Sequence, residues 1–500
     1  MTTAFHPVPV ALRGKVAHEY HNLVDGKWVA SASGRTFEDR NPASASDVIA
    51  TFPDSDARDV AAAVLAARKA FPAWMATPAP QRGAIIARAV AAMRERLEDL
   101  AQAMTWEEGK VLAEARVEVN RGLNAMDFLA GEGRRLTGQT VPSEVPGMFA
   151  FTRRRPLGVV GMITPWNFPF AVPAWKLGPA LVAGNTVVIK PAEQAPLSTQ
   201  LIVEALHDAG LPPGVLNLVH GGPEAGKAIV ADTRIRAISF TGSTEVGKLI
   251  NRAAAEHMVK VQLEMGGKNA CIVLADADLE KAARDVVSGA FGSTGQRCTA
   301  TSRVIVERRI KDAFVSRVVE LVRQTVKTGN GFEQGVVMGP LIDDRAIVKT
   351  EGYVATARNE GNTVVLGGKR ASGAGLDQGF FFEPTIIDGV RPEDTLNKEE
   401  VFGPVLAFLA ADGLADAIEI ANSVDYGLSG AIYTRDVAAA FEYAQQLEAG
   451  LLHVNCPTIY SEVQLPFGGI KDSGFGGREM GATAIDFYTE WQATYLSYGK

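Results

Sequence analysis

The chain has 500 residues, of which 47% are hydrophobic and 21% are charged, and its formal net charge is −7 at pH 7. This balance predicts a globular protein of two or three lobes, and the acidic charge excludes a basic nucleic-acid-binding surface. No apolar run is long enough to cross a membrane and the first 20 residues lack the apolar segment of a secretory signal, so we expect a cytoplasmic protein with neither membrane nor nucleic-acid partners.

The first part of the chain is expected to form a hairpin, helices and a strand. An Asp-Gly pair inside 23–29 suits a type I′ turn between two short strands. Apolar residues recur from 86 to 104 in steps of four and three, which predicts one helix with a single buried face. A further helix is expected over about 114–135, and its Arg121 reads first as a solvated charge. The run 148–154 predicts a protruding or edge strand that ends at a proline.

From residue 157 onward, short buried-strand patterns alternate with helical stretches. Such alternation predicts βαβ units and parallel sheets, with ligands at the carboxyl ends of the strands. The aromatic-rich tail 488–498 is a candidate edge strand for pairing with another subunit. Strands are expected at 159–164, 186–189, 215–219, 237–240, 271–274 and 302–306, and helices at 173–182, 198–209, 224–231 and 279–291.

One of the three cysteines, Cys298, stands out as a candidate nucleophile. It follows a run of small residues, Gly292-Ser293-Thr294-Gly295, which lets backbone amides approach a bound group. The adjacent Arg297 favours the thiolate, the reactive form of cysteine. An inert buried cysteine is the alternative on this segment alone. So few cysteines, with seven scattered histidines, predict neither a disulfide framework nor a metal site.

Two segments that follow predicted strands are candidates for nucleotide binding. FTGSTEVG opens a helix after a strand, which suits an anion, although a plain N-cap at Ser243 or Thr244 explains it equally well. Lys190 and Glu193 follow another strand, where an acid can accept hydrogen bonds from ribose hydroxyls and repel a 2′-phosphate. A solvated charged turn is the alternative for this pair.

Two more segments carry candidate catalytic groups. Asn167 lies between two prolines and two aromatic residues, so its amide is either a neutral donor to an oxyanion or part of a rigid turn. Glu264 ends a predicted strand just before two glycines, and it is either a general base or an incidental residue in a hinge.

The motifs ITPWNFP, KPAEQ, FTGSTEVG, EMGGKN, GQRC, EEVFGPV and PFGGIKDSG occur in one chain order. This set resembles the NAD(P)-dependent aldehyde dehydrogenase superfamily from about residue 20 to the C-terminus, except that Met265 replaces the usual Leu and that families differ at Arg297. The resemblance implies an α/β fold with a Rossmann-like parallel-sheet cofactor domain, an α/β catalytic domain and a small β oligomerisation element. The corresponding boundaries are 1–135 with 156–264, then 265–483, and 136–155 with 484–500.

The resemblance also implies roles for single residues. Cys298 would be the nucleophile, Glu264 the base for deacylation, and Asn167 with the Cys298 backbone amide the oxyanion hole, with Lys176 near the thiol. The coenzyme is expected to be NAD, with NADP as the alternative because Lys190 offsets the charge of Glu193. Residues expected to contact it are Ile163, Thr164, Trp166, Lys190, Glu193, Gly222, Gly226, Ser243, Val246, Glu400 and Phe402.

For the substrate, the resemblance places Arg121, Phe168, Trp175 and Arg297 along the access tunnel. Two guanidiniums suit a distal carboxylate or phosphate. We therefore expect an ω-carboxylated semialdehyde, because GQRCT and the C-terminal PFGGIKDSGFGGREMG also look like bacterial 2-oxoglutarate semialdehyde dehydrogenases. Succinate semialdehyde, phosphorylated or sulfonated aldehydes and broad specificity remain alternatives, and Arg297 either serves this site or only tunes the thiol or pairs with an acid.

Two other classes of protein are weighed against this hypothesis. A thiol hydrolase needs a histidine base, for which the sequence offers no clear candidate, and a non-catalytic nucleotide-binding protein has no use for intact Cys298, Glu264 and Asn167. Family members that pass the acyl group to coenzyme A typically lack the glutamate, so Glu264 favours hydrolysis to the free acid. The resemblance further implies a homodimer or homotetramer that pairs through about 138–155 and 484–498.

Overall fold

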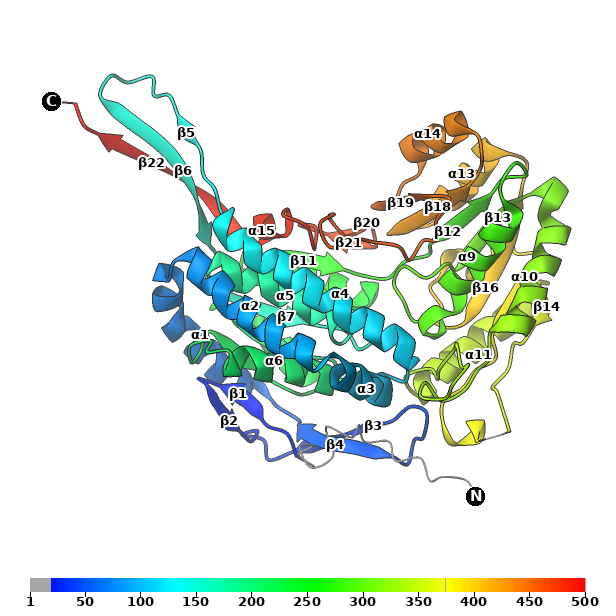
Figure 1. Ribbon diagram of the computed structural model, residues 1–500, viewed down its shortest axis with the longest axis horizontal. Coiled ribbons are helices and arrows are strands. Elements are labelled where there is room, and N and C mark those ends of the chain that lie inside the picture. Colours follow the sequence, from blue (N-terminus) through cyan, green and yellow to red (C-terminus); the bar gives the residue numbers. More distant parts are fainter. Residues whose placement is uncertain (1–18, 374, 500) are drawn as a thin grey trace.

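The computed structural model describes residues 19–373 and 375–499, which form two large sheets with their helices and a small protruding sheet (Figure 1). The first sheet places five parallel strands between an antiparallel hairpin and an antiparallel edge strand. Its order is β2 (Lys27–Val29), β1 (Asn22–Val24), β9 (Leu216–Leu218), β8 (Thr186–Lys190), β7 (Val159–Ile163), β10 (Ile235–Thr241), β11 (Lys260–Glu264) and β21 (Gly474–Phe475).

Helices cover both faces of this sheet, which explains why its central strands are mostly apolar and buried. Every residue of β8 is buried, as is usual when a parallel strand has helices on each side. Val160 packs into one core with Ile189, whereas the neighbouring Val159 and Val188 pack into the other. The first core holds α2 (Ala79–Glu95), α3 (Leu97–Glu108), α4 (Leu112–Gly131), α5 (Ala171–Ala183) and α6 (Leu197–Asp208), and the second holds α1 (Ala57–Ala76), α7 (Pro223–Ala231) and α8 (Thr244–Ala255).

The single helix expected over 86–104 is wrong, because the chain forms α2 and α3 with a break at Arg96. Arg96 has φ −110° and ψ 20°, so it leaves the helical conformation. The apolar residues on both sides of the break, such as Met93 and Leu100, are buried in the same core. The periodicity therefore reports the shared core face and not the continuity of the backbone.

The second sheet has seven strands and carries the loop of Cys298. Six neighbouring strands are parallel to one another, and α9 (Leu279–Phe291) has the predicted bounds. The order is β14 (Thr363–Leu366), β15 (Thr385–Asp388), β16 (Val405–Ala411), β13 (Arg303–Glu307), β12 (Ala270–Val273), β18 (Ser429–Tyr433) and β19 (Leu451–Val454). Its other helices are α10 (Lys311–Thr325), α11 (Asp344–Asn359), α12 (Thr395–Lys398), α13 (Leu414–Asn422) and α14 (Val437–Gln446).

The third sheet protrudes from the first lobe as a long ribbon (Figure 1). It consists of β5 (Thr140–Val141), β6 (Met148–Pro156) and β22 (Thr489–Ser497). Of the two alternatives for 148–154, the protruding strand is confirmed and the edge strand is wrong, because β6 pairs with β5 on one side and with the tail strand β22 on the other. The tail thus pairs first with its own chain, along nine residues.

The remaining elements are short. They are β3 (Thr36–Arg40), β4 (Val48–Pro53), β17 (Tyr426–Gly427), β20 (Ile470–Lys471) and α15 (Ala484–Phe487). Within the two described ranges, no helix has the length and apolar character needed to cross a membrane.

Candidate active site

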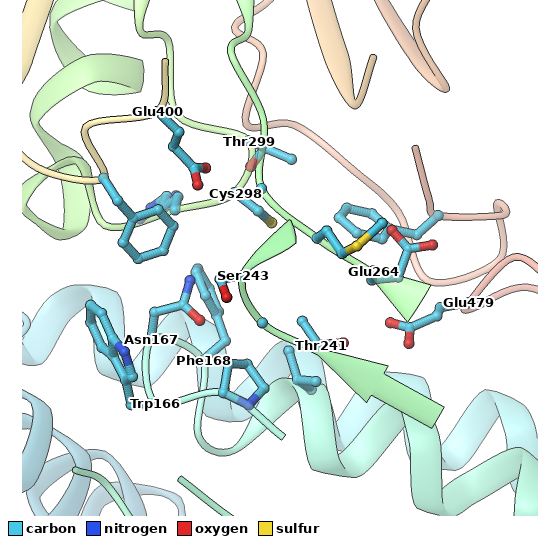
Figure 2. Close-up of a pocket in the computed structure, with 18 of the residues that line it drawn as sticks. Trp166, Asn167, Phe168, Thr241, Ser243, Glu264, Cys298, Thr299, Glu400 and Glu479 are labelled. Atoms are coloured by element: carbon cyan, nitrogen blue, oxygen red, sulfur yellow. The ribbon is translucent and has the colours of Figure 1, made fainter. Parts of the chain in front are cut away.

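A cavity of about 290 Å³ lies where the carboxyl ends of β10 and β11 meet the loop that precedes β13. Neighbouring β7 and β10 form the point at which the strand order of the first sheet reverses, the place where ligands bind in open α/β sheets. Figure 2 shows Asn167, Glu264 and Cys298 gathered around this cavity. Three candidates from distant parts of the sequence are thus brought together.

The loop that carries Cys298 begins with three successive left-handed residues. Ser293, Thr294 and Gly295 have φ values of 47°, 58° and 68°, and only the last lacks a Cβ. The carboxylate of Glu114 accepts the Ser293 backbone N–H at 2.9 and 3.0 Å, and the Thr294 hydroxyl donates to the Gly339 carbonyl at 3.1 Å. These bonds from neighbouring segments maintain a conformation that side chains normally disfavour.

The backbone at the nucleophile and just after it is held by Asn269, a residue to which the sequence analysis gave no role. Its Nδ2 donates to the carbonyls of Cys298 and Ala300, both at 2.8 Å, while its Oδ1 accepts the Ser429 N–H at 3.0 Å. Asn269 belongs to the motif EMGGKN, but only the fold reveals that it reaches residues about thirty positions further on.

Asn167 lies against the same loop. Its side-chain Nδ2 donates to the Gln296 backbone carbonyl at 2.9 Å, and the backbone carbonyl of Asn167 accepts from Lys110 Nζ at 2.7 Å. Lys110 is buried and also pairs with Glu118. Because Nδ2 carries two N–H groups, one remains for an oxygen atom in the cavity.

The electrostatics of the cavity favour neutral forms of the acid and the thiol. Burial, with the charges of Glu264 and Glu400, raises the pKa of Cys298 to about 12. Burial, with the charge of Glu479, raises the pKa of Glu264 well above its usual range. The expectation that Arg297 favours the thiolate is wrong for this geometry, because its guanidinium turns to Glu114 at 2.9 Å.

Lys176, expected near the thiol, does not line the cavity. Its Nζ donates to Glu479 and, at 2.8 Å, to Ser239 Oγ. Glu479 does line the cavity and also accepts the Trp175 Nε1–H at 2.6 Å. The sequence analysis missed Glu479, whose only signal was an isolated acid in the glycine-rich run before residue 482.

Several residues expected to contact the coenzyme border the same cavity. Trp166, Ser243, Glu400 and Phe402 all line it, and the rings of Trp166 and Phe402 meet edge to face at 5.5 Å. The Gly267 N–H donates to Glu400 at 2.8 Å and holds that carboxylate at the cavity wall. Phe402 has φ 59°, so its ring is presented from a strained backbone position.

The other expected coenzyme contacts cluster at the ends of β7 and β8. Lys190 Nζ lies 3.7 Å from Glu193 and donates to the carbonyls of Pro191 and Gly221. A Cβ added to Gly226 would be in ordinary contact with Lys190 and Ile163, at about 4 Å, whereas one added to Gly222 would meet nothing within 4 Å. Gly222 precedes α7, Thr164 follows β7, and Val246 lies exposed on the first turn of α8.

The role of Ser243 as an N-cap is present in the structure. Its hydroxyl accepts the Val246 N–H at 3.3 Å at the start of α8. Because Ser243 also lines the cavity, the positive end of this helix opens toward it, where an anionic group is favoured. The two interpretations of this motif are therefore compatible.

All four residues expected along the tunnel, Arg121, Phe168, Trp175 and Arg297, line the cavity. The first interpretation of Arg121 as a solvated charge is wrong, since its guanidinium lies 5.8 Å over the Trp175 ring and donates to Ser461. Arg297 pairs with an acid, which was one of the alternatives, and lies 5.7 Å over the Phe168 ring. No histidine lines this cavity in the described ranges.

The profile described as "Aldehyde dehydrogenase family" matches residues 28–494. The chain belongs to the aldehyde dehydrogenase family. It is 41% identical to an alpha-ketoglutaric semialdehyde dehydrogenase of Bacillus subtilis over 95% of this chain and 98% of that protein. It is 44% identical to a 2,5-dioxopentanoate dehydrogenase of Saccharolobus solfataricus over 95% and 99% of the two chains.

Solved structures show the same fold. A betaine aldehyde dehydrogenase of Staphylococcus aureus, solved in complex with NAD+, superposes with a TM-score of 0.95 at 34% identity, over 98% of this chain and 97% of that chain. The protein is thus an NAD(P)-dependent aldehyde dehydrogenase, and the α/β fold expected from its motifs is confirmed.

The residues of this aldehyde dehydrogenase fit a dinucleotide. The N-terminus of α8 offers amides for a pyrophosphate. Glu400 lines the cavity together with Ser243, and Glu193 lies beside Lys190 after β8; each carboxylate is able to accept from ribose hydroxyls. Gly222, where an added Cβ would meet nothing within 4 Å, and the neighbouring Gly226 leave room for a flat base. Glu400 is fixed by a backbone N–H and needs no rearrangement to do this.

Proposed function

We propose that this aldehyde dehydrogenase oxidises an ω-carboxylated semialdehyde, such as 2-oxoglutarate semialdehyde, to the free acid with NAD+. The observation that carries the substrate class is Arg121, a guanidinium that lines the cavity and has no acid partner among the described residues. A shielded and unpaired guanidinium favours a ligand with a carboxylate. The semialdehyde substrates in the names of two relatives at 41% and 44% identity support the same class.

The chemistry assigned to the chain begins at Cys298. The thiol loses its proton to water, the thiolate sulfur forms a bond to the aldehyde carbon, and the electron pair of the C=O π bond moves to the carbonyl oxygen, which becomes an oxyanion. The amide of Asn167 and the backbone N–H of Cys298 are the donors proposed for that oxygen. When bound, the dinucleotide accepts the hydride that leaves this carbon, so that the acyl group remains on sulfur as a thioester.

The second half of the reaction depends on Glu264. As a carboxylate it takes a proton from water, the resulting hydroxide adds to the thioester carbon, and the sulfur leaves as the acid is released. The raised pKa of Glu264 means that the carboxyl must first lose its own proton. Gly469, whose N–H donates to Glu264 at 3.3 Å, holds the side chain beside this path.

The direct test is a panel of matched aldehydes with purified enzyme. Glutarate semialdehyde and pentanal have the same chain length but differ by a terminal carboxylate. We expect kcat/KM for glutarate semialdehyde to exceed that for pentanal about tenfold or more, the effect of one charge-assisted hydrogen bond. Equal values, or a preference for pentanal, would contradict the proposed substrate class, and a Cys298→Ser variant should form no NADH with either aldehyde.

We also propose NAD as the preferred coenzyme and a homodimer or homotetramer as the working form. The carboxylate of Glu193 favours ribose hydroxyls over a 2′-phosphate, which supports NAD. The ribbon formed by β5, β6 and β22 exposes Trp491, Tyr495 and Leu496 on a short sheet, and such surfaces favour pairing with another copy.

A further inference from the structure

One side of α4 carries three charged side chains toward the active site. Glu114, Glu118 and Arg121 stand at i, i+4 and i+7, a spacing that places them along one face of a helix. Glu118 binds the buried Lys110 and accepts the Phe170 N–H at 3.1 Å. The carboxylate of Glu118 is therefore already paired with the buried Lys110.

Glu114 is occupied in a different way, by the loop of the nucleophile. Its carboxylate binds the Ser293 N–H and, at 2.9 Å, Arg297 Nη2, while Arg297 Nε donates to Ser293 Oγ at 3.1 Å. The three side chains therefore close a ring of hydrogen bonds over Gly292, whose added Cβ would lie 3.0 Å from Glu114. This ring fixes the left-handed turn that leads to Cys298.

The same contact decides which cation is available to a substrate. The side chains of Arg297 and Glu114 are only 17% and 23% exposed, so little solvent screens the attraction between them, and the positive charge of Arg297 is compensated. Lys349, another cation of the cavity wall, lies within electrostatic reach of Glu400 and Glu399 on the coenzyme side. Among the described residues, this leaves Arg121 without an ion-pair partner, because Glu118, the acid whose charge reaches it, is already paired with Lys110.

Arg121 is also placed to receive an anion. Its Nε is buried without a hydrogen-bond partner, and its other contacts are neutral, namely Ser461 Oγ and the sulfur of Met480. Burial lowers the pKa of Arg121, and the charge of a thiolate at Cys298 opposes this change. The guanidinium is therefore close enough to sense the reacting sulfur, yet among the described residues no carboxylate forms an ion pair with it.

We infer that Glu114 is a positioning residue of this active site. It holds the Cys298 loop through Ser293 and Arg297, and by neutralising Arg297 it leaves Arg121 as the cation that receives the distal anionic group of the substrate. The second half of this inference rests on the proposed function, whereas the first half concerns the thiol alone.

The first experiment compares single variants with glutarate semialdehyde and pentanal. For Arg121→Gln we expect kcat/KM for glutarate semialdehyde to fall about tenfold or more, mainly through KM, with less than about threefold change for pentanal. For Arg297→Gln we expect kcat/KM to fall by the same factor for both aldehydes. The matched control is Arg116→Gln, which removes an exposed arginine of the same helix, α4, that pairs with Glu98 on α3. This variant should leave the ratio of kcat/KM for the two aldehydes unchanged.

The second experiment frees the charge of Arg297. In Glu114→Gln the guanidinium loses its counter-ion, so the ratio of kcat/KM for glutarate semialdehyde to that for pentanal should rise, while kcat falls for both as the loop loosens. The double variant Glu114→Gln/Arg297→Gln should return that ratio to the wild-type value. If Glu114 only stabilised the fold, Glu114→Gln would lower kcat/KM equally for both aldehydes, and the double variant would not restore the wild-type ratio.

Alkylation of the thiol by iodoacetamide tests the first half without any substrate. Cys298 faces the carboxyl groups of Glu264, Glu400 and Glu479 and the guanidinium of Arg121. In Glu114→Gln, the uncompensated Arg297 should move the pH profile of alkylation to lower pH, and the double variant should move it back.

The possible results separate the two halves of the inference. A wild-type enzyme without preference for the carboxylate refutes the proposed function, and the alkylation profiles still decide the role of Glu114. A loss of selectivity in Arg297→Gln as large as in Arg121→Gln, or unchanged alkylation and substrate ratios in Glu114→Gln, overturns the inference. Thermal unfolding of each variant identifies any that do not fold, and the variants that fold then decide whether each half of the inference holds.

Discussion

Asn269 offers the sharpest test of how the fold holds the nucleophile. Replacement of Asn269 by Asp keeps the size of the side chain and the acceptor for the Ser429 N–H, but removes the donor to the carbonyls of Cys298 and Ala300. Each of the two lost hydrogen bonds stabilises the nucleophile loop by about 1 kcal/mol, so the variant loses about 2 kcal/mol of stabilisation. If this whole loss appears in the activation free energy, kcat falls about 30-fold. The residue is only 3% exposed, so repulsion between a carboxylate and two carbonyl oxygens adds to this figure.

The sign of the pH dependence makes this prediction specific. Burial raises the pKa of the introduced carboxyl, and its protonated form regains one donor, so the deficit in kcat should shrink as the pH falls. The assay is steady-state NADH formation from pH 6 to pH 9, in parallel with wild type. Asn422→Asp is the control, because Asn422 also binds a backbone carbonyl and a backbone N–H, but at an exposed position. Wild-type kcat with an unchanged pH profile in Asn269→Asp would refute the reasoning.

Three further predictions follow from the described contacts. Burial and the charge of Glu479 raise the pKa of Glu264, so Glu479→Gln should lower that pKa and move the rising limb of the kcat–pH profile to lower pH; an unmoved limb argues against this coupling. Glu193→Ser should reduce the preference for NAD over NADP about tenfold, measured as the ratio of kcat/KM, and a wild type without that preference contradicts the assignment. Light scattering should show a dimer or tetramer, and a particle of 53.2 kDa at micromolar concentration would contradict the proposed assembly.

Much of the fold could be predicted because its signals are local. The runs that became β7, β8 and β10 are mostly apolar and buried, and the Asp-Gly hairpin depends on two adjacent residues. The break at Arg96 could not be predicted, because the apolar face of α2 continues in α3 toward the same core. Periodicity measures which side is buried, and it is blind to a change of backbone direction that keeps that side buried.

In the candidate site too, residues within local motifs were predicted, and residues with distant partners were missed. Cys298, Glu264 and Asn167 were expected from motifs around them, and the fold brings them to one cavity. Glu114 and Glu479 were missed because their partners lie far along the chain, at Ser293 and Trp175. The sequence neighbours of these acids are ordinary, and only packing reveals what they bind. The positive charge of Arg297 is compensated by such a distant partner, Glu114, so its effect on the thiol was predicted wrongly.

The last strand of the first sheet has a consequence for synthesis of the protein. Glu264 ends β11, whose outer edge is completed by β21 from more than two hundred residues later. Until the ribosome has released Gly474 and Phe475, the strand that bears the proposed base has an open edge. A chain truncated before β21 would expose unpaired backbone groups that can join two copies in the wrong register, so we expect such fragments to aggregate.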